Sequence, residues 1–294
     1  MAKTSTRLSV PKMYKLFIGG KFARTESERY LEVLNPKNNE KICNISRASK
    51  KDVRNAVQAA APGLISWSSK TGYERGQILY RLAEMLEGRK EQFIEEIILS
   101  TGASKSNAKK EVEAAIDRVI YYAGFSDKWM QLYGTVNPVQ NNYFNFSIPE
   151  PVGIVAIVLP DTLSFIPLVS RICSVIASGS SCVILANEKY PLPALSFSEV
   201  IATSDVPSGT INILTGKKSE LISHLCGHFD VRAVDLCTSD KELIKNVQEL
   251  CALNVKRLYY FSDKHDWFSK NENNNLEQII KFTEIKTVWH TMAY

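Results

Sequence analysis

Cysteine and histidine are among the side chains of this 294-residue chain that could act as nucleophiles or metal ligands. The last cysteine, Cys251, lies in the apolar pattern of a predicted helix, which favours a buried thiol over a nucleophile. His224, Cys226 and His228 form an H-x-C-x-H cluster, but positions i and i+2 of a helix point in different directions. We therefore predict no metal site there. The other cysteines lie in or beside apolar runs without C-x-x-C spacing, as is typical of reduced thiols in a cytoplasmic protein: Cys43, Cys173, Cys182 and Cys237.

The charge and hydropathy patterns argue against two classes of partner. The formal net charge is +5 and the lysines are scattered, whereas a nucleic-acid site needs a concentrated basic stripe. Every apolar run falls short of the roughly 20 residues that a membrane-spanning helix requires. We therefore expect neither a nucleic-acid nor a membrane partner. The first dozen residues, MAKTSTRLSVPK, are basic and faintly resemble a transit peptide, but a frayed N-terminus is the favoured interpretation.

The elements that must position any site begin with a short β segment followed by helices. Residues 14–22 alternate and turn at two glycines, which indicates a hairpin. Ser49 and Asp52 form a capping box at the start of the next helix. Apolar stripes at helical spacing predict two more helices, at 78–86 and 107–129. Alternation predicts a strand within 136–148.

Five short apolar runs, separated by helical stretches, follow at 152–159, 181–187, 210–216, 233–238 and 255–261. Continuous apolar runs indicate strands that are buried on both faces. Strand–helix repetition indicates right-handed parallel crossovers, so we predict an α/β fold with a doubly wound parallel sheet. The stretch 262–275 is rich in Asn and Lys, which predicts a polar linker outside the core. A last helix at 276–281 and a terminal strand with Ile285 and Val288 complete the pattern.

Several of these segments, in the same order along nearly the whole chain, resemble the aldehyde dehydrogenase superfamily. They are YKLFIGGKF (14–22), LNP (34–36), EPVGIVAIVLP (150–160), DVPSGTINILTG (205–216) and FTEIKTVWHTMAY (282–294). The resemblance is strongest to the degenerate second module of family 16 aldehyde dehydrogenases. It implies an N-terminal helical part of a Rossmann-like cofactor domain (1–135), an oligomerisation hairpin (136–149), the doubly wound part (150–262), a polar linker (263–275), and a C-terminal helix and oligomerisation strand (276–294).

The chain departs from the family pattern at each position that the resemblance would assign to catalysis. Pro160 is followed by Asp161 and Thr162 in place of the W-N pair whose Asn stabilises the oxyanion, and a carboxylate opposes the developing negative charge. The general-base Glu of the family falls on Phe261. The domain that carries the nucleophilic Cys in the family is missing between Phe261 and the terminal strand. We therefore predict no catalytic residue, since acyl transfer needs nucleophile, base and oxyanion donors together.

The cofactor positions implied by the resemblance are degenerate as well. The K-P-x-E motif, which holds the adenosine ribose in the family, retains only Glu188. The phosphate-binding turn has lost its glycines; Ser239 remains, and Asp240 adds negative charge. Lys217 and Lys218 begin a helix where active enzymes touch adenosine. These four remnants (Glu188, Lys217, Lys218 and Ser239) could hold NAD(P), but a framework glutamate and exposed lysines are the plainer interpretation, and we expect no bound cofactor.

In the aldehyde dehydrogenase family, a hairpin and a C-terminal strand form a flap through which subunits associate. The resemblance therefore implies a role in oligomerisation for the alternating hairpin and the terminal strand of this chain. The predicted partner-binding residues are Phe144, Phe146, Ile148, Ile285 and Val288. The leading hypothesis is a cytoplasmic pseudoenzyme that binds an aldehyde dehydrogenase-type chain, or a second copy of itself, through the flap. One alternative is an NAD(P)-dependent oxidoreductase acting on aldehydes, with the missing catalytic domain supplied by a partner. The other is a dinucleotide-binding sensor, for which the fold alone is a weak argument.

Overall fold

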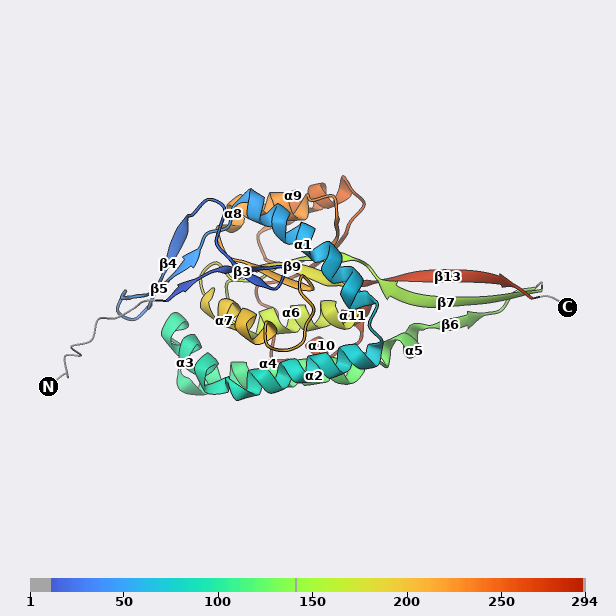
Figure 1. Cartoon of the computed structure of the whole chain (residues 1–294), viewed down its shortest axis with the longest axis horizontal. Helices are drawn as coiled ribbons and strands as arrows, with labels where there is room; N and C mark the ends of the chain where they lie inside the picture. Colours follow the sequence, from blue (N-terminus) through green and yellow to red (C-terminus); the bar gives the residue numbers. More distant parts are fainter. Residues whose placement is uncertain (1–11, 141, 293–294) are drawn as a thin grey trace.

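The computed structural model describes residues 12–140 and 142–292, so the interpretation of residues 1–11 lies outside the described part. At its centre is a seven-stranded sheet with the order β12-β11-β8-β9-β10-β2-β3 (Figure 1). Its parallel strands coincide with the five predicted runs and confirm the doubly wound α/β fold. The order reverses at β8, because β9 lies on one side of it and β11 on the other. The bounds are β8 (Ile154–Val158), β9 (Ser181–Leu185), β10 (Ile211–Leu214), β11 (Val231–Cys237) and β12 (Arg257–Phe261).

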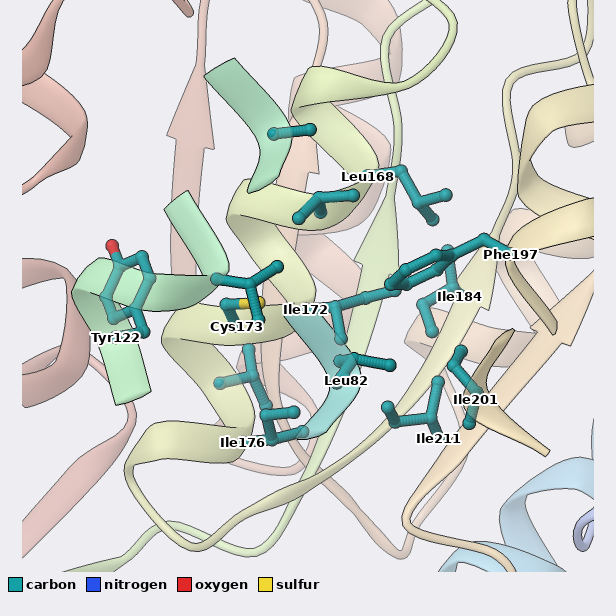
Figure 2. Packing of buried hydrophobic residues seen from close by; sticks show 14 of the residues in the cluster. Leu82, Tyr122, Leu168, Ile172, Cys173, Ile176, Ile184, Phe197, Ile201 and Ile211 are labelled. Carbon is teal, nitrogen blue, oxygen red and sulfur yellow. The ribbon is translucent and has the colours of Figure 1, made fainter. Parts of the chain in front are cut away.

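Helices cover both faces of this sheet, so its central strands are buried on both sides. One face is covered by α1 (Lys50–Ser68), α8 (Lys218–Cys226) and α9 (Lys241–Ala252). The other is covered by α6 (Ile166–Ala177) and α7 (Leu192–Ile201), with an outer layer of α2 (Gly72–Gly88), α3 (Lys90–Thr101) and α4 (Lys105–Phe125). Figure 2 shows α6 side chains between Ile184 and Ile211 of the sheet and Tyr122 of α4. This burial of apolar surface is the main favourable contribution to folding.

Two local signals predicted from the sequence are confirmed. The hairpin pairs β2 (Leu16–Ile18) with β3 (Lys21–Ala23), and its turn residues Gly19 and Gly20 have φ of 59° and 73°, which favours glycine. Helix α1 begins at the predicted capping box, where the backbone N of Ser49 donates to Asp52 Oδ2 at 2.7 Å. A small second sheet contains β1 (Met13–Tyr14), β5 (Lys41–Ser46) and β4 (Tyr30–Leu34).

The predicted helix at 107–129 is two helices. Helix α4 ends at Phe125, and a short helix, α5 (Trp129–Tyr133), begins after a turn. The turn directs Trp129 into the core, where it is fully buried and its Nε1 donates to the carbonyl of Ala177 at 3.1 Å. The apolar stripe continues across the turn, so periodicity alone could not reveal the break.

A three-stranded antiparallel sheet, the flap, projects from the body as an arm (Figure 1). It contains β13 (Thr283–Thr291), β7 (Tyr143–Pro151) and β6 (Thr135–Asn137), in that order. The predicted strand within 136–148 is therefore a hairpin of two strands, and the predicted terminal strand pairs with β7 along its whole length. The flap thus joins segments that are far apart in the sequence.

The predicted polar linker at 263–275 is wrong, because this stretch is folded against the body. We define residues 262–282, which join β12 to β13, as the closing segment. It contains α10 (Lys270–Asn273) and α11 (Glu277–Ile280), and its Trp267 is only 1% exposed. Within the described residues, no second α/β domain stands between β12 and β13.

Hydrogen bonds to α4 explain how so polar a segment can be buried. Arg118 donates to the carbonyl of Trp267 at 3.1 Å. Tyr122 donates to the carbonyl of Asn273 at 2.9 Å. The Asn273 side chain, itself buried, donates to the carbonyls of Asp266 and Ser269 at 2.8 and 2.9 Å. These bonds satisfy most of the buried polar groups, although Trp267 Nε1 and Arg118 Nη1 have no partner among the described residues, so they offset much of the cost of burying the segment.

Candidate functional site

The carboxyl ends of β8 and β11 meet where the strand order reverses, which is where doubly wound sheets bind ligands. A cavity of about 340 Å³ opens there, which we name the switch-point cavity. Its lining includes the carboxylates of Asp161, Asp240 and Asp263 and the ammonium group of Lys218. Carboxylates outnumber the ammonium group, so the cavity disfavours an anionic ligand.

The N-terminus of α9, which points at this cavity, is capped by the chain's own carboxylate. Asp240 Oδ1 accepts from the backbone N of Glu242 at 2.9 Å and of Leu243 at 3.2 Å. A helix N-terminus binds a phosphate through such free N–H groups and the positive end of its dipole. Here the Asp240 carboxylate accepts from these N–H groups and lies at the positive end of the dipole, as the side chain of an N-cap residue does. The sequence predicted that Asp240 brings unfavourable charge, and the structure adds that it occupies the donors.

The predicted remnant Ser239 is held in a contact between two loops. Its backbone N donates to Asp263 Oδ2 at 2.9 Å, and its Oγ accepts from the backbone N of Asp263 at 2.9 Å. These reciprocal bonds join the end of β11 to the closing segment. Asp263 thereby places a second carboxylate beside the N-terminus of α9.

The other three predicted remnants lie together, but they bind one another. Glu188 Oε1 accepts from Lys217 Nζ at 2.8 Å, and its Oε2 accepts from the backbone N of Lys218 at 2.9 Å. Lys218 Nζ donates to the carbonyl of Leu159 at 2.6 Å and pairs with Asp161 Oδ2 at 2.7 Å. Asp161 Oδ1 accepts from the backbone N of Glu188 at 2.7 Å, which closes the network. A ribose hydroxyl or a phosphate would have to displace these internal partners.

Phe261, where the resemblance placed the family's general base, is part of a buried contact that the sequence analysis missed. Its ring centroid lies 4.5 Å from the guanidinium carbon of Arg171. Arg171 Nε donates to Asp235 Oδ2 at 2.5 Å, and Nη1 donates to Gln278 Oε1 at 3.1 Å. Both charged side chains are at least 98% buried. The sequence did carry a signal for this contact, because the apolar α6 contains one positive charge, Arg171, and the apolar β11 contains one buried negative charge, Asp235.

These residues do not fit the pyrophosphate of a dinucleotide, although the fold implies one. The N–H groups at α9 are taken, and carboxylates stand where phosphate would lie. The described residues, 12–140 and 142–292, also contain no cluster of three or more His, Cys, Asp or Glu able to hold a metal ion. In the H-x-C-x-H motif, Cys226 is buried while His224 is exposed.

The thiols are buried as predicted. All six cysteines are free and buried, and burial raises the pKa of Cys173 to about 12 and of Cys43 to about 11. Cys251 is 3% exposed, and burial raises its pKa too. A nucleophilic cysteine needs the opposite environment, one that favours the thiolate. None of the described helices is long and apolar enough to cross a membrane.

The flap divides the predicted partner-binding residues between two faces. Residues that pair directly across antiparallel strands point to the same face. Val288 and Val136 both pair with Phe146, and they share its face with Phe144 and Ile148. We name these five residues the apolar face; Val136 is 69% and Phe144 is 42% exposed, and the others are half-buried.

Ile285 pairs with Pro149 and therefore lies on the opposite face of the flap, where Trp289 also lies. Ile285 is 57% and Trp289 62% exposed. The sequence analysis did not include Trp289 or Val136. Trp289 could have been found from the sequence, because it alternates with Ile285 and Thr287 along the predicted terminal strand.

The reversed strand order and the switch-point cavity define a doubly wound α/β protein of the dinucleotide-binding type, carrying a flap. A family model described as "Aldehyde dehydrogenase family" matches residues 22–260. The chain therefore belongs to the aldehyde dehydrogenase family, as the resemblance predicted. The narrower resemblance to the second module of family 16 stays a prediction.

Three proteins to which this chain is similar are each longer than the chain itself. It is 33% identical over 264 residues to the cytosolic 10-formyltetrahydrofolate dehydrogenase of Mus musculus, covering 87% of this chain and 29% of that protein. It is 30% identical over 251 residues to aldehyde dehydrogenase, cytosolic 1 of Elephantulus edwardii, covering 83% and 49%. The betaine aldehyde dehydrogenase of Staphylococcus aureus in complex with NAD+ superposes with a TM-score of 0.80 at 25% identity, covering 84% and 49%. The chain thus spans less than a third of the first relative and about half of the other two.

Proposed function

We propose that this chain is a non-catalytic member of the aldehyde dehydrogenase family that acts as an assembly module through its flap. The observation that carries the proposal is a contrast between two parts of the molecule. The donors around the switch-point cavity are bound to the chain's own carboxylates, while the flap keeps an apolar face exposed. The occupied donors around the cavity favour the loss of cofactor binding, and the exposed apolar face favours a retained contact with another protein chain.

The absence of catalysis is argued from three requirements of aldehyde oxidation by this family. A thiolate nucleophile, a general base and oxyanion donors must converge on one carbon. Among the described residues, the thiols are buried in apolar surroundings, Phe261 stands at the base position, and Asp161 is engaged by Lys218. NAD(P) binding is opposed by the same carboxylates that line the cavity.

The partner that we propose is an aldehyde dehydrogenase-type chain, either a second copy or a catalytically complete relative. The apolar face combines aromatic and β-branched side chains on a projecting arm, a setting in which exposed apolar surface usually marks an interaction site. A cytoplasmic location fits six unpaired thiols, which an oxidising compartment would tend to cross-link.

Affinity purification of the chain from its own cells, followed by mass measurement of the complex, tests the proposal. We expect either a second copy or an aldehyde dehydrogenase chain to be recovered. The variant Val136→Asp/Phe144→Asp should lose that partner, because it places charge on the apolar face. Ile65→Asp is the matched control, since Ile65 is 71% exposed on α1 and is not part of the apolar face. Recovery of monomer alone, or equal recovery with the flap variant, would overturn the proposal.

A further inference from the structure

We infer that two copies of this chain pair through the outer edges of their β13 strands, antiparallel, about a two-fold axis at Thr287. The result would be a continuous six-stranded sheet made from two flaps. This inference rests on the proposed function and narrows its partner to a second copy. It uses the edge of the flap, whereas the proposed docking surface is its apolar face.

The outer edge of β13 has unpaired backbone groups. In the order β13-β7-β6, β13 is terminal, and none of the described strands pairs with its outer side. Phe282 O accepts from Val152 N and Met292 N donates to Asn142 O, both at 3.0 Å, so even-numbered residues face β7. Backbone groups alternate in direction along an antiparallel strand. Ile285, Thr287 and Trp289 therefore direct their N–H and C=O groups outward.

The start of this edge is already closed, which defines where pairing can begin. Arg257 Nη1 donates to the carbonyl of Thr283, the first outward carbonyl of the strand. The open part begins at Ile285 and runs toward the tip of the arm. An exposed edge of this kind is a template for a further strand unless charge, proline or a bulge blocks it. The register of β13 against β7 contains no bulge or proline on β13, and the charged Glu284 and Lys286 of this strand pair within the chain, with Arg257 and Glu150.

A two-fold axis at Thr287 pairs the open residues Ile285–Trp289 with those of the second copy, because Thr287 is also the midpoint of β13 (Thr283–Thr291). Ile285 then lies opposite the partner's Trp289, and Glu284 lies opposite the partner's His290. An axis at Lys286 would instead place two lysines opposite each other. An axis at Val288 would place Ile285 opposite the partner's Thr291 and Trp289 opposite the partner's Thr287, so neither Ile285 nor Trp289 would meet an apolar side chain. Apolar pairs across strands are favourable and like-charge pairs are not, so the axis at Thr287 is preferred.

A row of hydrogen-bonded side chains across the flap ends at Thr287 and supports the same axis. Asn137 Nδ2 donates to Ser147 Oγ at 2.9 Å, and Ser147 Oγ lies 2.8 Å from Thr287 Oγ1. A hydroxyl can donate one bond and accept two, so Thr287 has capacity for a further partner. About the two-fold axis, that partner is the hydroxyl of the partner's Thr287. The row then runs without interruption through both flaps.

The most exposed apolar side chains of β13 are covered by this arrangement. Ile285 and Trp289 flank Thr287 on the same face and are 57% and 62% exposed. Each Trp289 ring would pack on the partner's Ile285, once on either side of the axis. The arm projects from the body (Figure 1), so antiparallel arms place the two bodies at opposite ends of the joined sheet.

Cysteine cross-linking tests the register directly. Residues opposite each other in such a pair have Cα atoms about 5.5 Å apart, within the range that a disulfide spans. We expect Thr287→Cys to form a disulfide-linked dimer under mild oxidation, against a low background because the native cysteines are buried. Thr291→Cys is the control: the two copies would lie about 27 Å apart, since each residue adds about 3.4 Å. Failure of Thr287→Cys to cross-link, or equal cross-linking of Thr291→Cys, would overturn the inference.

Charge reversal gives a second readout that does not depend on disulfide geometry. His290→Glu places two glutamates opposite each other at both ends of the pairing and should weaken dimerisation about tenfold in sedimentation equilibrium. Glu284→Lys/His290→Glu should restore it, and failure of that rescue would count against the register. If Val136→Asp/Phe144→Asp loses its cellular partner while Thr287→Cys stays monomeric, the proposed function stands and the inference falls. If Thr287→Cys cross-links while Val136→Asp/Phe144→Asp keeps its cellular partner, pairing through β13 stands and docking through the apolar face falls.

Discussion

Arg171→Met should destabilise the protein strongly, because it leaves the carboxylate of Asp235 buried without its charge partner. In the native protein, Arg171 Nε lies 2.5 Å from Asp235 Oδ2, and the two side chains are 2% and 0% exposed. Removing one member of a buried pair typically costs about 3–5 kcal/mol, since the remaining charge is neither solvated nor paired. Methionine retains most of the arginine stem's volume, so the loss reports charge more than a cavity. The contact to Gln278 of the closing segment is lost as well.

The same substitution should make stability depend on pH in a defined direction. Burial raises the pKa of Asp235, and Arg171 opposes that rise. Without Arg171 the pKa rises further, so the native carboxyl keeps its proton to a higher pH than the unfolded chain does. The unfolded value is about 3.9, and above it the native state binds more protons than the unfolded state. The stability of Arg171→Met therefore falls as pH rises from that value through the raised native pKa.

Urea denaturation followed by circular dichroism, at pH 5 and pH 8, measures both effects. We expect the larger loss at pH 8. Arg171→Met/Asp235→Leu should recover most of it, because no charge is left buried. Lys41→Met is the control: its partner Glu32 is 2.8 Å away, but both side chains are 42–50% exposed, so a change within about 1 kcal/mol is expected. A loss below about 1 kcal/mol for Arg171→Met, or one that is equal at both pH values, would refute the reasoning.

Three further predictions concern the cap, the closing segment and the thiols. Asp240→Ala should cost about 1 kcal/mol of unfolding free energy and Asp240→Gly only a few tenths, as is usual for an N-cap residue; equal losses in urea titrations would contradict its capping role. Trp267→Ala should cost about 3–5 kcal/mol, whereas the exposed Trp289→Ala should leave the stability of the monomer within about 0.5 kcal/mol. A small loss at Trp267 would mean that the closing segment is not part of the core. The six buried cysteines should fail to react with a thiol reagent at pH 8 until urea unfolds the protein, since burial raises the pKa of Cys173 to about 12; rapid native labelling would refute this.

The parallel strands were predictable because a strand buried on both faces leaves a continuous apolar run in the sequence. The hairpin was predictable from Gly19 and Gly20, whose positive φ few other residues tolerate. The closing segment was not, because its burial depends on donors supplied by Arg118 and Tyr122 of another element. Composition records how polar a segment is, but it does not record whether its polar groups are satisfied.

The residues of the candidate site could be named from the sequence, but their contacts could not. Glu188 was predicted as a remnant of ribose binding, yet its carboxylate binds Lys217 and the backbone of Lys218, which approach it only in the folded chain. The division of the flap into two faces depends on the register of β13 against β7, and a shift of one residue would exchange them. Alternation along a strand already separates Ile285 from Val288, but only the register shows that Val288 is the one that shares a face with Phe146.

Calorimetric titration of the purified chain with NAD+ and NADP+ tests the central claim most directly. The betaine aldehyde dehydrogenase of Staphylococcus aureus, whose structure holds NAD+, is a suitable positive control. We predict no heat of binding at cofactor concentrations that saturate the control, because the donors at α9 and around Glu188 are already bound within the chain. Binding in the micromolar range would contradict the account, since a dinucleotide would then displace those internal contacts.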